Sequence, residues 1–99
     1  MTKEQILRRL EEGLVECEIP DYMRYGIRLY IKDGIEPGGF LCAAISNDLK
    51  GACARADGTN KRYLYNYAML LYNHFPKIAQ GSEENVTEWI KRGGLSGIE

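Results

Sequence analysis

The sequence predicts an all-α fold: a compact bundle of four main helices followed by a short C-terminal helix. Apolar residues recur at intervals of three and four along most of the 99-residue chain, as they do on one face of an amphipathic helix. Glycine and proline interrupt the pattern at the expected helix ends, and no segment shows the alternation typical of a strand. A chain of this length, 44% apolar, is suited to one domain with a modest core. We expect that domain over residues 1–95, with a flexible tail over residues 96–99.

Clear boundary signals mark the first two helices. Thr2 and Gln5 have the spacing of a capping box, in which each side chain bonds the other's backbone N–H, and this predicts a helix that ends near Cys17. Pro20 opens a second helix, because the first turn does not need the N–H that proline lacks. Gly34 ends that helix, since glycine readily adopts the left-handed conformation found after helix C-termini.

A long third helix is predicted from about Phe40 to Asp57. At 100° per residue its apolar stripe contains two charged side chains, Asp48 and Arg55, two turns apart. Taking a charge out of water is costly unless the charge is paired and hydrogen-bonded. Asp48 and Arg55 therefore either form an internal ion pair or line a polar pocket.

Two more helices complete the prediction. A fourth helix spans about residues 60–75 and is ended by Pro76, which cannot continue a helix. A short last helix begins after the capping residue Ser82, has two glutamates in its first turn and ends at Gly93–Gly94.

Charge balance and composition argue against several classes of protein. Thirteen basic and 14 acidic residues give a net charge of −1, whereas proteins that grip a nucleic-acid backbone usually present a strongly basic face. The 3 cysteines are too few and too far apart for a disulfide framework, which favours a reducing cytoplasm. No apolar run is long enough to predict a membrane span, and no metalloprotease, nucleophile-elbow or paired CxxC motif predicts catalysis. We therefore expect a cytoplasmic, non-enzymatic protein without metal or cofactor.

The start of the third helix is a candidate anion site. Gly38 and Gly39 leave backbone N–H groups approachable, and the helix dipole adds partial positive charge there, as at many phosphate sites. Arg55, oriented by Asp48, could add a planar fork that binds phosphate or carboxylate in a bidentate way. Alternatively, the glycines only let the chain turn, and the charged pair is structural.

Polar and aromatic residues near the fourth helix extend this candidate site. Tyr63 and Tyr65 stand beside Arg62, and exposed tyrosine next to arginine is typical of protein interfaces and of stacked bases. The third and fourth helices could also form a helix-turn-helix, although the third is long for that motif. The predicted ligand site comprises Gly38, Gly39, Phe40, Asp48, Arg55, Asn60, Arg62, Tyr63 and Tyr65.

Six short motifs follow one another between residues 19 and 95. They are Ile19-Pro20, Pro37-Gly38-Gly39-Phe40-Leu41, Asn47-Asp48-Leu49, Arg55-Ala56-Asp57 with Asn60, Tyr72-Asn73, and Trp89 before Gly93-Gly94-Leu95. In this order they resemble a group of short phage and prophage proteins, most of which have no assigned function. Glu36 stands where that group is expected to have a second proline. The resemblance implies a small phage-encoded accessory protein, of the kind that sequesters host immune nucleotide signals or occludes a host protein.

Together these observations predict a non-enzymatic homo-oligomer that binds, and by analogy sequesters, a small anionic ligand resembling a nucleotide. The alternative is an inhibitor or adaptor that acts on a host protein through exposed tyrosines. A DNA-binding regulator is a third alternative, which the balanced charge disfavours.

Overall fold

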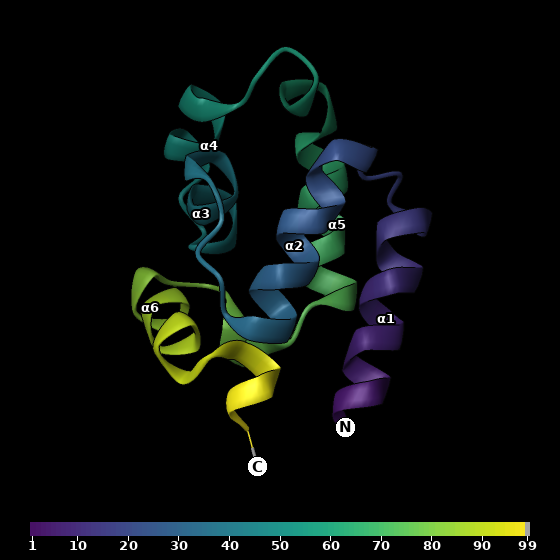
Figure 1. Ribbon diagram of the computed structural model, residues 1–99. Coiled ribbons are helices and arrows are strands. Elements are labelled where there is room, and N and C mark those ends of the chain that lie inside the picture. The colour runs from purple at the N-terminus through teal and green to yellow at the C-terminus, as the bar shows by residue number, and fades with distance from the viewer. Residues whose placement is uncertain (99) are drawn as a thin grey trace.

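Every regular element of the computed structural model, which describes residues 1–98, is helical, and this confirms the predicted all-α class. Over these residues there are six α-helices and three short 3-10 helices, rather than four main helices and a short fifth. In chain order they are α1 (Lys3–Glu16), α2 (Asp21–Asp33), α3 (Gly39–Ile45), α4 (Leu49–Arg55), η1 (Asn60–Tyr63), α5 (Leu64–His74), η2 (Lys77–Ala79), α6 (Glu83–Arg92) and η3 (Gly94–Gly97) (Figure 1).

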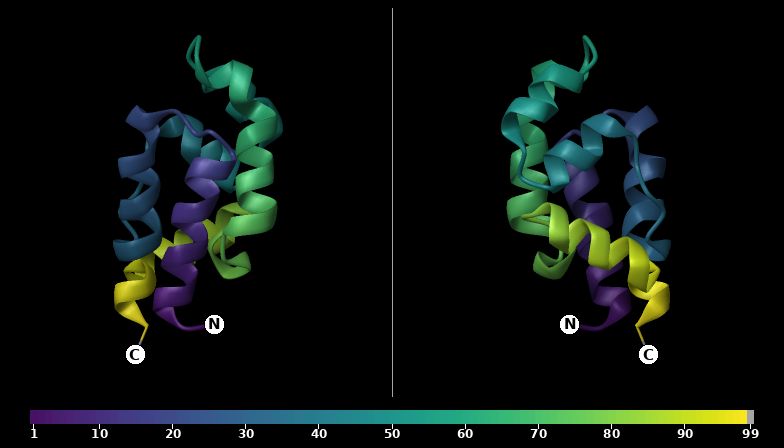
Figure 2. Two further views of the ribbon diagram at one scale, coloured as in Figure 1. Left: turned by 90° about the vertical axis from the view of Figure 1, so that its right-hand side faces the viewer. Right: turned by 90° about the vertical axis from the view of Figure 1, so that its left-hand side faces the viewer.

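Three helices, α1, α2 and α5, run roughly along one another and form the main body (Figures 1 and 2). The α3–α4 pair lies to one side and is joined to α5 by residues 56–63, while α6 runs across the direction of the other helices. The predicted capping box begins α1: the Gln5 backbone N donates to Thr2 Oγ1 at 3.1 Å, and the Thr2 backbone N donates to Gln5 Oε1 at 2.9 Å.

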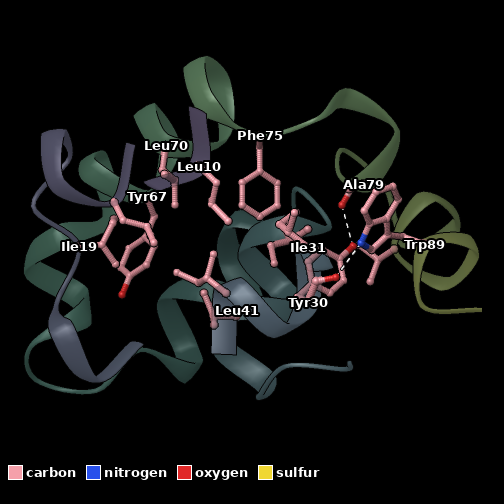
Figure 3. Packing of buried hydrophobic residues seen from close by; sticks show 14 of the residues in the cluster. Leu10, Ile19, Tyr30, Ile31, Leu41, Tyr67, Leu70, Phe75, Ala79 and Trp89 are labelled. Carbon is pink, nitrogen blue, oxygen red and sulfur yellow. Dashed lines mark hydrogen bonds between the residues drawn. The ribbon is translucent and has the colours of Figure 1, made fainter. Parts of the chain in front are cut away.

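The core includes Tyr30 and Trp89, whose polar atoms are bonded although both side chains are fully buried. Trp89 Nε1 donates to the Tyr30 carbonyl at 2.8 Å, and the Tyr30 hydroxyl donates to the Ala79 carbonyl at 2.7 Å (Figure 3). These two bonds hold α6 and η2 to α2. Since an unpaired buried donor would cost about 1–3 kcal/mol, they make this arrangement of three distant segments specific.

The predicted long third helix is wrong: it is broken at Asn47 into α3 and α4, of 7 residues each. Asn47 has φ 66°, and the Asp48 N–H reaches back to the Ala43 carbonyl at 2.8 Å, which is the closing bond of a Schellman motif. The Asp48 side chain then accepts from the Gly51 backbone N at 2.9 Å and begins α4. Two residues that favour helix ends thus override the apolar periodicity on either side of them.

This break also overturns the prediction that Asp48 and Arg55 lie on a buried face. Because Asn47 leaves the helical conformation, the two helices no longer share one register, and both charged residues are exposed. Within the described part of the chain, no ion pair joins Arg55 to Asp48. The predicted internal ion pair is therefore not formed.

The chain end, described as far as residue 98, packs against α2, whereas the sequence predicted a flexible tail over residues 96–99. Leu95 is buried, residues 94–97 form η3, and the Ser96 hydroxyl lies 2.7 Å from Asp33 Oδ1 at the end of α2. The backbones of Gly34 (φ 67°) and Gly94 (φ 63°) touch, so that a Cβ on Gly94 would lie 2.5 Å from the Gly34 N. Glycine at both positions therefore allows η3 to dock on α2; Glu99 lies outside the described residues.

Candidate functional site

Three of the nine predicted ligand residues meet in one cavity between α3, α4 and α6. Gly39, Asp48 and Arg55 line this hollow, which has a volume of about 560 Å³. The Arg55 side chain runs back along α4, where its Nη1 donates to the Gly51 carbonyl at 3.3 Å. It also passes close to the start of α3, since a Cβ on Gly39 would lie 3.1 Å from Arg55 Cδ. The break at Asn47 therefore brings Arg55 beside Gly39, whereas one continuous helix would have kept the two residues about 24 Å apart.

The charge of this Arg55 cavity does not favour an anion. Glu36, Asp48 and Glu83 line it together with Arg55, so the lining carries three carboxylates and one guanidinium. Negative charges in the same cavity oppose the attraction that a phosphate would feel toward the arginine. The cavity is suited to a ligand that carries positive as well as negative charge better than to a simple phosphate.

Two of the predicted ligand residues belong to the core. Phe40 is buried and packs edge-on against Tyr67, with ring centroids 5.0 Å apart. Asn60 is only 2% exposed, and its Oδ1 accepts from the Tyr67 hydroxyl at 2.6 Å. Both side chains are enclosed by protein and out of reach of a ligand.

The remaining predicted residues do not join the Arg55 cavity. Arg62 and Tyr63 lie in η1 and Tyr65 lies in the first turn of α5, and none of these three lines the cavity. Gly38 is exposed beside the cavity but is not part of its lining. The tyrosine–arginine group and the glycine–arginine group are thus separate surfaces.

A second hollow, which the sequence did not predict, lies between the α3–α4 pair and α5. This α4–α5 groove has a volume of about 320 Å³. Its apolar wall comes mainly from Leu49 and Ala52 of α4 and from Leu64, Ala68, Leu71 and Tyr72 of α5. Leu49 is 71% exposed and Tyr72 is 81% exposed. Large apolar side chains gathered around a hollow in this way are typical of a surface that binds a partner.

The groove continues past Tyr72 into a positively charged surface. A neighbouring hollow of about 520 Å³ shares four lining residues with the groove: Leu71, Tyr72, Gln80 and Gly81. Arg9 and Lys77 also line this second hollow. We call the Arg9–Lys77 part the basic end of the groove. Among the described residues that line these two hollows there is no aspartate or glutamate. The groove therefore combines an apolar wall with a positive end.

One signal in the sequence could have revealed this groove. The apolar residues of α5 lie on more than one side of the helix and divide between two surroundings. Tyr67, Leu70 and Phe75 enter the core, whereas Leu64 and Ala68 turn to the groove. A helix that is apolar over most of its circumference needs cover on more than one side.

The connector between α4 and α5, residues 56–63, is held by Asp57. Its carboxylate accepts from the Asn60 N at 2.7 Å, the Thr59 N at 3.1 Å and the Tyr22 hydroxyl at 2.6 Å. The Asn60 and Tyr22 bonds lower the pKa of Asp57, and the same carboxylate raises the pKa of Tyr22. Because Tyr22 belongs to α2, this contact fixes residues 56–63 to the main body and so helps to place α4 opposite α5.

The described residues show few features of catalytic chemistry. Over residues 1–98 no three histidine, cysteine or acidic side chains are grouped so that they could hold a metal ion. Burial raises the pKa of Cys17 and of Cys42, which is opposite to the shift that activates a thiol nucleophile. In the same part of the chain, none of the helices has the length and apolar character needed to cross a membrane.

Comparison with protein-family models, with curated proteins and with solved structures found no significant match to this chain. Its function is therefore inferred from its own residues.

Proposed function

We propose that this protein is a non-enzymatic binding protein that docks an apolar segment of a polypeptide in the α4–α5 groove. The observation that carries the proposal is the pair Leu49 and Tyr72, two large side chains that remain mostly exposed at the edge of an apolar hollow. Fully burying a leucine side chain stabilises a complex by roughly 1.5–3 kcal/mol, and tyrosine is enriched among the residues that dominate binding energy. The groove thus offers two anchors next to each other.

The chemistry of the groove also specifies the segment that fits it. The apolar wall requires apolar side chains, and Arg9 and Lys77 at the basic end favour carboxylates. No acidic residue among the described groove-lining residues would repel those carboxylates. A segment with apolar residues beside aspartate or glutamate is the expected occupant.

Photo-crosslinking from inside the groove tests this proposal. A photoreactive benzoyl-phenylalanine at position 49 should crosslink to a polypeptide, and the crosslinked peptide should contain apolar residues next to a carboxylate. The same group at position 15 is the control, because Val15 is 67% exposed but lies on α1, outside the groove. Ala68→Glu, which places a charge on the exposed floor of the groove, should abolish the adduct. Equal crosslinking from both positions, or an adduct unaffected by Ala68→Glu, would refute the proposal.

A small anionic ligand in the Arg55 cavity is the second candidate function. In its favour, Arg55 lies beside Gly39 in a cavity of about 560 Å³, a size common among small-molecule sites. A nucleotide-like ligand bound there should be seen by native mass spectrometry as added mass that is lost in Arg55→Ala. Because Glu36 and Glu83 oppose an anion, the double change to glutamine should strengthen such binding. Unchanged binding in both variants would eliminate this candidate.

The wider role suggested by the resemblance to phage proteins is also a proposal. A polypeptide docked in the groove is compatible with an accessory protein that occludes a host protein in the cytoplasm. Identification of the crosslinked peptide would show whether the partner is a host protein.

A further inference from the structure

The surface of this protein carries an apolar and acidic segment that matches its own groove. We propose that the α4–α5 groove binds a second copy of the chain through Ile35, Glu36 and Glu83. This inference rests on the proposed function, because it names the occupant of the same groove.

The apolar part of this segment is Ile35, in the connector between α2 and α3. Ile35 is 52% exposed, although it directly follows Gly34, which is packed against η3. Its backbone N donates to the Leu29 carbonyl at 3.3 Å, so the connector is tied to the end of α2. Ile35 is therefore an apolar side chain that a well-anchored backbone presents to solvent.

The acidic part lies directly beside it. Glu36 follows Ile35 in the chain, and Glu83 lines the same cavity from the first turn of α6. Both glutamates are exposed. The segment thus presents one branched apolar side chain next to two carboxylates.

The groove offers the complementary groups. Leu49 and Tyr72 can cover Ile35, while Arg9 and Lys77 can pair with Glu36 and Glu83 of the second copy. Opposite charges attract over a screening length of about 10 Å at 0.1 M salt, so the pairing also orients the two copies. Burial of the apolar groups supplies the short-range part of the attraction.

The resulting contact is head-to-tail. The groove and its basic end are lined by residues of α1, α3, α4, α5 and η2. The apolar and acidic segment belongs to the α2–α3 connector and α6, so two different patches of the chain meet. Each copy in a pair retains one unused patch. Association of this type continues until a ring closes or a filament forms.

Charge-reversal variants test the inference by light scattering coupled to gel filtration. The wild type should have a mass above the 11.3 kDa of one chain and should dissociate at about 1 M salt, where the screening length falls to about 3 Å. Lys77→Glu should be monomeric, as should the double variant Glu36→Lys/Glu83→Lys. An equimolar mixture of the two should associate again, because the acidic segment of Lys77→Glu is complementary to the unaltered groove of the double variant. Lys61→Glu, on the exposed side of η1, is the matched control and should leave the mass unchanged.

Three results would overturn the inference. The first is a monomeric wild type at low salt. The second is that Glu36→Lys/Glu83→Lys associates like the wild type while Lys77→Glu is monomeric. The groove would then pair with a different patch. The third is a Lys61→Glu control that dissociates as fully as Lys77→Glu, because loss of any positive charge would then suffice. A monomeric wild type would refute self-association but not the proposed function, which the crosslinking from position 49 tests separately. The failure of the inference can therefore be distinguished from the failure of the proposed function.

Discussion

Replacing Asn60 with alanine should destabilise the fold rather than remove a ligand contact. Asn60 lies at the start of η1, is 2% exposed, and accepts the Tyr67 hydroxyl at 2.6 Å. In Asn60→Ala the hydroxyl keeps its buried position but loses its acceptor. The sequence alone placed Asn60 in a ligand site, so this variant separates the two interpretations.

The expected cost follows from the burial of both partners. Tyr67 is itself 3% exposed, so water cannot readily replace the lost acceptor, and an unsatisfied buried hydroxyl costs about 1–3 kcal/mol. The contact from Asn60 Nδ2 to Met23 Sδ, at 3.5 Å, is weak and adds little. We therefore expect Asn60→Ala to lower the free energy of unfolding by about 1–3 kcal/mol, or the melting temperature by roughly 4–8 °C per kcal/mol for a domain of this size.

Urea unfolding followed by circular dichroism measures this change. Tyr67→Phe removes the donor of the same bond, so the double variant should be less destabilised than the sum of the two single variants. Asn73→Ala, on the exposed side of α5, is the control and should change stability by less than about 0.5 kcal/mol. If Asn60→Ala were as stable as the control, or if the two single changes were simply additive, the assignment of Asn60 to the core would be refuted.

Three further changes test other parts of the structure. Gly94→Ala should lower the free energy of unfolding by about 1–3 kcal/mol in a denaturant titration, because Gly94 combines a positive φ with a contact to the Gly34 backbone. Gly38→Ala is the control and should be nearly neutral, because a Cβ on Gly38 would have nothing within 4 Å. Asn47→Ala should lower the free energy of unfolding by about 1–2 kcal/mol, because alanine is strained in the left-handed conformation of this position. Asn47→Gly should not show this loss, and equal stabilities of the alanine and glycine variants would refute the Schellman geometry. The lowered pKa of Asp57 means that its contribution to stability is complete above the ordinary aspartate pKa near 4 and is lost as pH falls through the lowered folded value. Asp57→Asn should therefore flatten the dependence of stability on pH in the acid range, and an unchanged slope would contradict this.

Local chemistry in the sequence was sufficient for the helical class and for several boundaries. Thr2 and Ser82 cap α1 and α6 with their own side chains, and Gly34 and Gly93 end α2 and α6 in the left-handed conformation. Each of these boundaries depends on residues within five positions of one another. Interactions of such short range can be recognised in a sequence because the chain itself brings the partners together.

The same short-range chemistry explains the main error in the predicted fold. Asn47 and Asp48 carry the signals of a helix end and a helix start, whereas the apolar periodicity around them predicts one continuous helix. The break changes the angular relation between α3 and α4 and so moves Asp48 and Arg55 to the surface. A single left-handed residue therefore decided whether this charged pair was buried.

The sequence by itself determined that this chain is helical and where most of its helices begin and end. Only the tertiary structure decided that Arg55 lies beside Gly39 and that three carboxylates share the Arg55 cavity. It also decided that Asn60 and Phe40 belong to the core, and that α5 turns part of its apolar surface to an open groove. The physical reason is that burial and charge at a site depend on which distant segments meet there. Arg9 and Lys77 are 68 positions apart, and neither shows in its local sequence that both lie at the end of the same groove.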